Sequence, residues 1–289
     1  MARLLEGKVA VITGGGRGIG RETSLLMASE GARVVAADMF RDADGVAAAD
    51  KVVKEIKDAG GDAATAYDSV TTMAGGANII KTAMDAFGKV DILVCCAGNF
   101  VKKPFTDLTE AEFDSLMAVH VKGHFSVAKA AVPHMIRQKS GRIITFTSRA
   151  AFSGGPNAVG YATAKGAVLG FNSCLSKELK PYNITVNCIS PSAVTQLFPG
   201  DVTLRKGTDN MPRGDPKVGP DCIAPTIVFL ATDDARDITG RVIYSSGTDI
   251  CLYEEPFKLS SAHVFLRRPS GKWTVNELRE LIPTLSGMA

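Results

Sequence analysis

The sequence predicts an α/β fold in which helices cover both faces of a parallel β-sheet. Seven short apolar runs are spread over the first 250 residues, and most of the segments between them are long enough for a helix. The runs are rich in valine, isoleucine and alanine, as is typical of strands buried on both faces. They are Lys8–Thr13, Arg33–Ala37, Ala63–Tyr67, Asp91–Cys95, Arg142–Thr147, Ile184–Ile189 and Arg241–Ser245.

The composition limits the class of protein. The chain of 289 residues is 45% hydrophobic and 22% charged, which is typical of a globular protein with a sizeable core. Its net charge of +3 is too small to favour nucleic acid or a membrane surface as a partner, and no apolar run approaches the length of a membrane-spanning helix. The six cysteines follow no disulfide framework. We therefore expect a cytoplasmic protein with reduced thiols.

A glycine-rich loop follows the first apolar run. Glycine allows a tight turn and lets a pyrophosphate approach the backbone. The helix expected from Ile19 onward offers unpaired N–H groups and the positive end of its dipole. The strand before the loop and the helix after it favour a dinucleotide site over an ordinary glycine turn. The candidate cofactor-binding residues of this loop are Gly14, Arg17, Gly18, Ile19 and Gly20.

An acidic residue ends the second apolar run. Asp38 follows Val34–Ala37, where a carboxylate can accept hydrogen bonds from both hydroxyls of an adenosine ribose. The same carboxylate would repel a 2′-phosphate, so the sequence favours NAD over NADP as the cofactor. Two arginines complicate this preference, because the guanidinium of Arg17 or of Arg41 could bind a phosphate.

A second candidate site lies in Tyr161–Lys165, with Ser148 thirteen positions before the tyrosine. Tyr161 and Lys165 are four residues apart and share one face of a helix. A tyrosine is a poor base at neutral pH, but a nearby ammonium lowers its pKa, so this pair could move a proton to or from a hydroxyl. Taken alone, the pair could also be an exposed helix pair. The cofactor loop upstream favours catalysis.

Two segments depart from the alternating pattern. Residues 196–220 are rich in proline and glycine and follow the sixth apolar run, so we expect a lid over the substrate or else a surface insertion. We place the main domain at residues 1–250 and a C-terminal extension at residues 251–289, which packs on the body or on a partner subunit. A capping box at Thr274–Glu277 opens an amphipathic helix in this extension.

These motifs, in this order, resemble those of the short-chain dehydrogenase/reductase family over roughly residues 5 to 250. The resemblance implies a single doubly wound, Rossmann-like domain around a seven-stranded parallel sheet. It also implies that Ser148, Tyr161 and Lys165 are catalytic, and that the tyrosine and the lysine contact the cofactor as well. Further cofactor contacts carried over from the family are Asp68, Ser69, Ala97, Gly98, Val194 and Thr195.

The chain departs from the family pattern at three places. Cys95–Cys96 stands where two asparagines are usual, and Ser192 where a glycine is usual. His120 stands where the family has a catalytic-network asparagine, and we count it among the catalytic candidates. It either helps a water or a backbone carbonyl to relay protons to Lys165 or is a buried core histidine. His124 follows four residues later, but no third ligand is evident, so we expect no metal site.

Some parts of the sequence resemble one subgroup of the family in particular. These parts are His120 and the stretches Ala49–Ile56, Tyr67–Val70 and Thr82–Gly88. These are similar to the (3R)-hydroxyacyl-CoA dehydrogenase unit of peroxisomal multifunctional β-oxidation enzymes. The similarity implies an NAD-dependent oxidoreductase that interconverts a (3R)-3-hydroxyacyl-CoA and its 3-oxo form, as a homodimer or homotetramer. Two alternatives stay open: a dehydrogenase of hydroxysteroids or other cyclic alcohols, and a dinucleotide-binding sensor without turnover.

Overall fold

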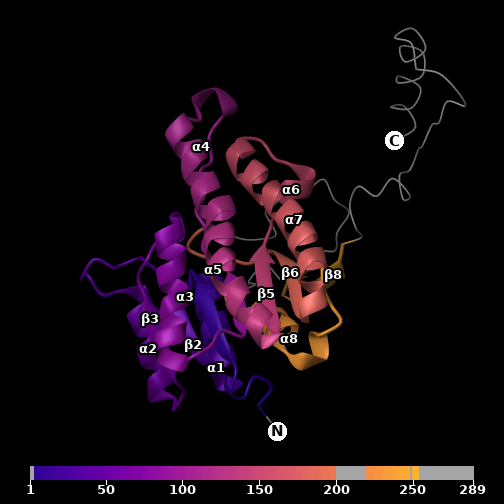
Figure 1. The fold of residues 1–289 in the computed structure, drawn as a ribbon. Coiled ribbons are helices and arrows are strands. Elements are labelled where there is room, and N and C mark those ends of the chain that lie inside the picture. The colour runs from indigo at the N-terminus through magenta and orange to yellow at the C-terminus, as the bar shows by residue number, and fades with distance from the viewer. Residues whose placement is uncertain (1–2, 200–218, 248, 254–289) are drawn as a thin grey trace, which may run out of the picture. The chain divides into compact units, whose positions relative to one another are not determined.

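The computed structural model describes residues 3–199, 219–247 and 249–253, which belong to one compact unit, Met1–Tyr253. Within these residues, strands form one sheet in the order β3-β2-β1-β4-β5-β6-β7-β8 (Figure 1). From β1 to β7 the strands pair in parallel, so their carboxyl ends lie at one edge of the sheet. The strands are β1 (Val9–Thr13), β2 (Arg33–Ala37), β3 (Ala63–Ala66), β4 (Ile92–Cys95), β5 (Gly141–Phe146), β6 (Ile184–Pro191), β7 (Val242–Ser246) and β8 (Asp249–Leu252).

The expected α/β fold is confirmed, and the sheet has one strand more than the family resemblance implies. Strand β8 pairs antiparallel with β7 at the edge of the sheet. Its side chains alternate between half-buried and exposed, so it lacks the continuous apolar run that marks the other strands. Residues 251 and 252, which the sequence assigned to the C-terminal extension, therefore belong to the sheet. The capping box at Thr274–Glu277 and most of the expected lid at 196–220 lie outside the described residues.

Helices cover both faces of the sheet because the side chains of each strand alternate in direction. On β1, for example, Ile12 joins one core cluster and Val11 joins the other. The helices on the first face are α1 (Gly18–Ser29), α2 (Ala48–Asp58) and α8 (Ala224–Ala231). Those on the second face, shown in Figure 1, are α3 (Met73–Phe87), α5 (Gly123–Gln138) and α7 (Val159–Leu179). None of the helices in the described part of the chain is long and apolar enough to cross a bilayer.

One helical segment changes its winding in the middle. Helix α4 (Glu110–Met117) begins with a capping box between Thr109 and Glu112. It runs through a π-helical turn, η2 (Ala118–Lys122), directly into α5. Such widened turns are frequent at functional sites, and this one carries His120. The remaining short helices are η1 (Phe105–Asp107), α6 (Ala150–Ser153), η3 (Lys180–Tyr182), η5 (Pro220–Cys222) and η6 (Asp233–Ala235).

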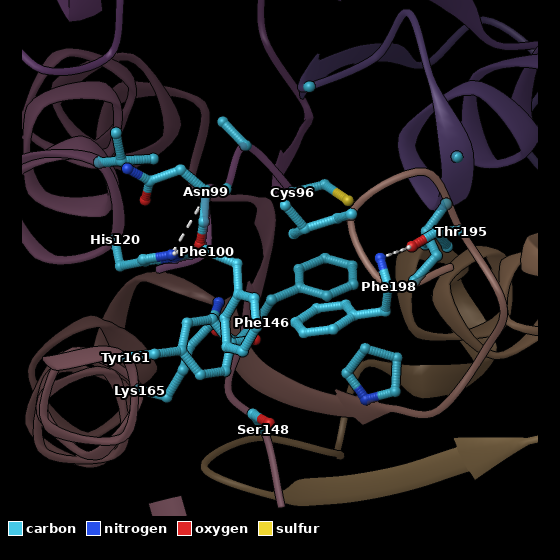
Figure 2. Close-up of a pocket in the computed structure, with 18 of the residues that line it drawn as sticks. Cys96, Asn99, Phe100, His120, Phe146, Ser148, Tyr161, Lys165, Thr195 and Phe198 are labelled. Carbon is cyan, nitrogen blue, oxygen red and sulfur yellow. Dashed lines mark hydrogen bonds between the residues drawn. The ribbon is translucent and has the colours of Figure 1, made fainter. Parts of the chain in front are cut away.

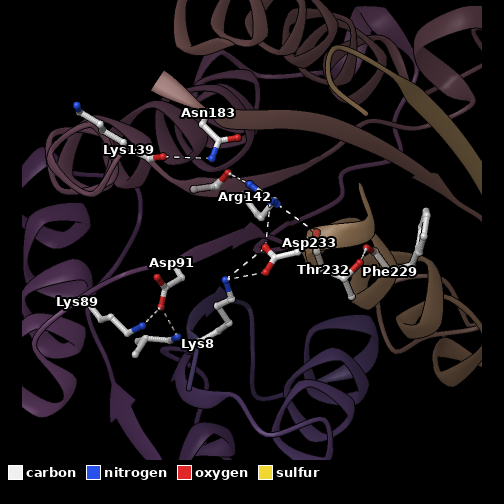
Figure 3. A network of polar contacts seen from close by, with 11 residues as sticks. Lys8, Lys89, Asp91, Lys139, Arg142, Asn183, Phe229, Thr232 and Asp233 are labelled. Atoms are coloured by element: carbon white, nitrogen blue, oxygen red, sulfur yellow. Dashed lines mark hydrogen bonds and ion pairs between the residues drawn. The ribbon is translucent and has the colours of Figure 1, made fainter. Parts of the chain in front are cut away.

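A polar network joins the amino ends of the strands, on the side of the sheet opposite the carboxyl ends (Figure 3). The buried guanidinium of Arg142, at the start of β5, donates to the Thr232 carbonyl at 3.2 Å and to the Asp233 carboxylate at 3.3 Å. Lys8, just before β1, reaches the same carboxylate at 3.3 Å. The network therefore ties the segment after α8 to the sheet.

We expect Arg142→Met to lower the free energy of unfolding by about 2 kcal/mol, because it leaves the buried Thr232 carbonyl without its guanidinium donor. Lys8→Met is the matched control, since it removes a more exposed cation from the same carboxylate and should cost less than about 1 kcal/mol. Urea unfolding of both variants measures the difference. Equal losses would show that the buried guanidinium adds nothing beyond a surface ion pair.

Candidate active site

A cavity of about 1150 Å³ lies along the carboxyl ends of the parallel strands. Asp68 follows β3 and Ser148 follows β5, and four strand spacings separate them, which is roughly 19 Å at the usual distance between strands. The cavity is therefore long enough for an extended ligand. The predicted site residues that line it are Gly14, Arg17, Gly18, Ile19, Asp38, Asp68, Ser69, Ala97, Gly98, His120, Ser148, Tyr161, Lys165 and Thr195.

Two predicted cofactor residues do not line the cavity. A Cβ atom on Gly20 would lie 2.1 Å from the carbonyl oxygen of Gly14. Glycine at this position therefore lets the first turn of α1 pack closely on the loop. Val194 is half-buried, and the cavity is lined by its neighbours Ala193 and Thr195 instead, because successive side chains along the segment point in different directions.

The glycine loop has the geometry that an anionic ligand requires. Gly14 and Gly18 have φ angles of 67° and 50°, in the left-handed region that favours glycine. A Cβ on Gly14 would lie 3.0 Å from the backbone of Ala97, so the loops after β1 and β4 come close together. Arg17 precedes α1, and no side chain caps the first N–H groups of the helix. These groups can donate to a phosphate.

The end of β2 presents a carboxylate with a cation beside it. Asp38 is buried, and its Oδ1 accepts from the backbone N–H of Phe40 at 3.0 Å. Its Oδ2 lies 3.6 Å from Nε of Arg17, whose guanidinium stacks 3.9 Å from the centroid of the Phe40 ring. Arg41 does not line the cavity, and its guanidinium donates to the Gly45 carbonyl at 2.9 Å. Arg17 is thus the arginine that faces this end of the cavity.

Ser148, Tyr161 and Lys165 lie together on one side of the cavity (Figure 2). The ammonium of Lys165 is 5.7 Å from the centroid of the Tyr161 ring and donates to the Phe146 carbonyl at 2.9 Å. Burial lowers the pKa of Lys165 to about 8, so most of it still carries its charge near neutral pH. A fixed positive charge beside a phenol favours the phenolate. The arrangement can therefore exchange a proton with a bound hydroxyl.

Two aromatic residues that the sequence analysis did not identify form a wall beside the tyrosine. The rings of Phe100 and Phe198 lie 5.0 Å and 5.8 Å from the Tyr161 ring and 4.7 Å from each other (Figure 2). Phe100 comes two residues after Gly98, and Phe198 lies at the start of the expected lid. No sequence motif marks either phenylalanine as a site residue. Their role depends on the fold, which brings the two loops together. We refer to this pair as the aromatic wall.

His120 is buried and lines the same cavity. Its Nε2–H donates to the Asn99 carbonyl at 2.8 Å, and its Nδ1 has no partner among the described residues (Figure 2). Burial, together with the charge of Lys165, lowers the pKa of His120 to about 2. The imidazole therefore stays neutral. It can hold a water or a hydroxyl by hydrogen bonding, but it cannot carry a proton as imidazolium.

The second histidine serves the sheet rather than the cavity. His124 Nε2 accepts from the backbone N–H of Phe146 at 3.3 Å, and burial lowers the pKa of His124 to about 3. Among the residues that the structure describes, no group of three or more His, Cys, Asp or Glu side chains could hold a metal ion.

The comparison with known proteins identifies the family of the chain. The sequence profile of the family described as short chain dehydrogenase matches residues 8–200. The chain belongs to the short-chain dehydrogenase/reductase family. It is therefore an oxidoreductase that uses a nicotinamide dinucleotide to interconvert an alcohol and a ketone. The family resemblance of the sequence motifs is confirmed.

Two relatives and one solved structure show the extent of the likeness. A short-chain type dehydrogenase/reductase of Mycobacterium tuberculosis is 36% identical over 247 residues, which cover 84% of this chain and 84% of the relative. The peroxisomal hydratase-dehydrogenase-epimerase of Saccharomyces cerevisiae is 38% identical over 235 residues, which cover 79% of this chain and 25% of that longer protein. The crystal structure of a short chain dehydrogenase from Mycobacterium avium matches with a TM-score of 0.84 at 31% identity, over 99% of this dehydrogenase and 96% of that chain.

We expect acid to destabilise the dehydrogenase less when His120 is replaced by asparagine. The pKa of His120 is about 2 in the folded state and near 6.5 in the unfolded state, so between these values only the unfolded state binds the proton. Stability is therefore lost as the pH falls below about 6.5. Urea unfolding at about pH 7 and pH 5 should show a smaller loss for His120→Asn than for the wild type. An equal loss would contradict the neutral state of the buried imidazole.

A second prediction for His120 concerns turnover. If the imidazole holds a water or a hydroxyl, His120→Asn keeps a hydrogen-bonding side chain and should retain most of the rate. His120→Leu removes it and should lose about tenfold to a hundredfold. Alcohol oxidation at saturating cofactor measures both variants. Similar, wild-type-like rates in both would rule out the proton relay and leave His120 as a core residue.

Proposed function

We propose that this dehydrogenase is NAD-dependent and oxidises (3R)-3-hydroxyacyl-CoA thioesters to their 3-oxo forms, or catalyses the reverse reaction. The observation that carries the proposal is the aromatic wall beside Tyr161 in a cavity whose far end holds the Asp38 carboxylate. The wall fits an apolar carbon chain next to the reacting hydroxyl. The carboxylate fits an adenosine ribose without a 2′-phosphate.

The preference for NAD rests on the charges at the end of β2. Asp38 is held in the cavity by the Phe40 N–H, so its negative charge faces the position of the ribose hydroxyls. Arg17 is the cation at this end, and it lies beside this carboxylate and stacks on Phe40. Arg41 donates to Gly45 and does not line the cavity. The carboxylate is therefore only partly offset, and a 2′-phosphate would meet it directly.

Ser148, Tyr161 and Lys165 have separate roles in the proposed reaction. A nicotinamide dinucleotide, which the glycine loop and Asp38 would hold, would supply the hydride acceptor for the alcohol carbon, or the donor in the reverse direction. Ser148 Oγ holds the reacting oxygen, and Tyr161 takes the hydroxyl proton. Lys165, fixed by the Phe146 carbonyl, keeps a positive charge beside the phenolate and would also bind the ribose next to the nicotinamide. The aromatic wall excludes water from this proton transfer.

The acyl-CoA part of the proposal draws on the likeness to the yeast hydratase-dehydrogenase-epimerase, whose name includes a dehydrogenase. It also draws on the sequence resemblance to the (3R)-hydroxyacyl-CoA dehydrogenase unit of such enzymes. The assembly as a homodimer or homotetramer and the cytoplasmic location stay predictions.

Mixing the purified protein with NAD and a panel of alcohols tests the function through the absorbance of NADH. The panel holds (3R)- and (3S)-3-hydroxyacyl-CoAs of several lengths and hydroxysteroids, with NADP in parallel. We expect NADH from the (3R)-thioesters only, because the sequence resembles the (3R)-hydroxyacyl-CoA dehydrogenase unit of the multifunctional enzymes. Tyr161→Phe is the control and should lose at least about a hundredfold in rate.

The other outcomes are equally informative. Activity on steroids or small cyclic alcohols alone would keep the mechanism and reject the thioester. A preference for NADP would contradict the interpretation that the Asp38 carboxylate disfavours a 2′-phosphate. Binding of NAD without reduction of any cofactor across the panel would favour a dinucleotide-binding sensor.

A further inference from the structure

A lysine stands at the substrate end of the cavity without a role in the chemistry described above. Lys102 lies in the loop after β4, two residues beyond Phe100 of the aromatic wall, and lines the cavity with its side chain exposed to solvent. Because Phe100 touches the Tyr161 ring, this loop borders the place where the substrate hydroxyl must lie.

The loop is held in place next to Lys102. The backbone N–H of Lys103 donates to the Asn157 carbonyl at 2.9 Å, which fixes the loop against the segment that leads into α7. Pro156 from that segment also lines the cavity. The position of the Lys102 backbone is therefore set by the same contacts that shape the substrate end.

The two neighbouring lysines differ in their partners. Lys103 does not line the cavity, and its ammonium pairs with the Glu112 carboxylate at 2.5 Å. Lys102 makes no ion pair with any residue that the structure describes. Within the described part of the chain its charge is therefore unused, whereas the charge of Lys103 is paired with that of Glu112.

The carboxylates that line the cavity, one of them beside Arg17, lie away from its substrate end. The acidic residues that line it, within the described part of the chain, are Asp38 and Asp68, at the ends of β2 and β3. The substrate end, around Ser148, holds the cations Lys102, Arg149 and Lys165 and no carboxylate from the described residues. A substrate that carries a negative charge is favoured at this end over a neutral or cationic one.

We propose that Lys102 binds an anionic group of the substrate outside the aromatic wall. Resting on the proposed function, that group is a phosphate of the CoA moiety, while the acyl chain lies against Phe100 and Phe198. An apolar wall next to a cation suits a substrate with an apolar chain and an anionic head. A neutral cyclic alcohol would leave the lysine without a partner.

Two thioesters of the same acid test this assignment: (3R)-3-hydroxybutyryl-CoA and the N-acetylcysteamine thioester, which has no phosphate. We expect Lys102→Gln to raise KM for the CoA thioester about threefold to fivefold, as for an exposed ion pair, with kcat unchanged. KM for the N-acetylcysteamine thioester should stay the same. Lys102→Arg should restore the wild-type KM, and Lys103→Gln, the matched control, should not change it. Added salt should raise the wild-type KM toward that of Lys102→Gln.

An unchanged KM for the CoA thioester in Lys102→Gln, or an equal rise for both thioesters, would overturn the assignment. If neither thioester is oxidised, the proposed function fails, and Lys102 is judged on whichever alcohol of the panel is oxidised. A higher KM in Lys102→Gln for an anionic alcohol would then support the anion site. An unchanged KM, or turnover of neutral alcohols alone, would overturn it.

Discussion

The parallel pairing of β1 to β7 places every functional loop of this dehydrogenase at one edge of the sheet. Helices bury these strands on both faces of the sheet. A crossover helix carries the chain from the carboxyl end of one strand back to the amino end of the next, so all of these strands run in the same direction. The glycine loop, Asp38, Ser148 and the segment after β6 meet along one cavity for this reason. The polar network of Arg142 and Asp233 sits at the other edge, where it supports the sheet without entering the site.

Burial of polar groups is the second feature on which the site depends. Lys165 and His120 are both nearly inaccessible to water, and desolvation pushes the pKa of each downward. The consequences differ, because the ordinary pKa of lysine is higher: Lys165 remains mostly charged near neutral pH, whereas His120 becomes permanently neutral. One environment thus supplies a cation for the phenolate and an uncharged hydrogen-bonding imidazole, whose ring centroid lies 5.4 Å from that of Tyr161.

The departures from the usual family residues fit this apolar surrounding. Cys96 stands at the cavity, and burial raises the pKa of its thiol to about 12, so it stays protonated and lines the cavity as a small, weakly polar group. Ser192 is buried, and its backbone N–H donates to the Ser245 carbonyl at 3.0 Å, which joins the segment after β6 to β7.

The sequence by itself determined the strands, the glycine loop and the placing of Tyr161 and Lys165 on one helix face, because these depend on short-range patterns: apolar runs, glycine conformations and helical spacing. Ser148 joined this pair through the family resemblance. Only the tertiary structure decided that Phe100 and Phe198 meet at Tyr161, that Arg17 rather than Arg41 faces the cavity, and that Gly20 packs on Gly14. These contacts join loops far apart in the chain, and they are set by strand order and by the space left between neighbouring loops. Strand β8 was missed for a related reason, since an edge strand with one open face lacks the apolar run that identifies a buried one.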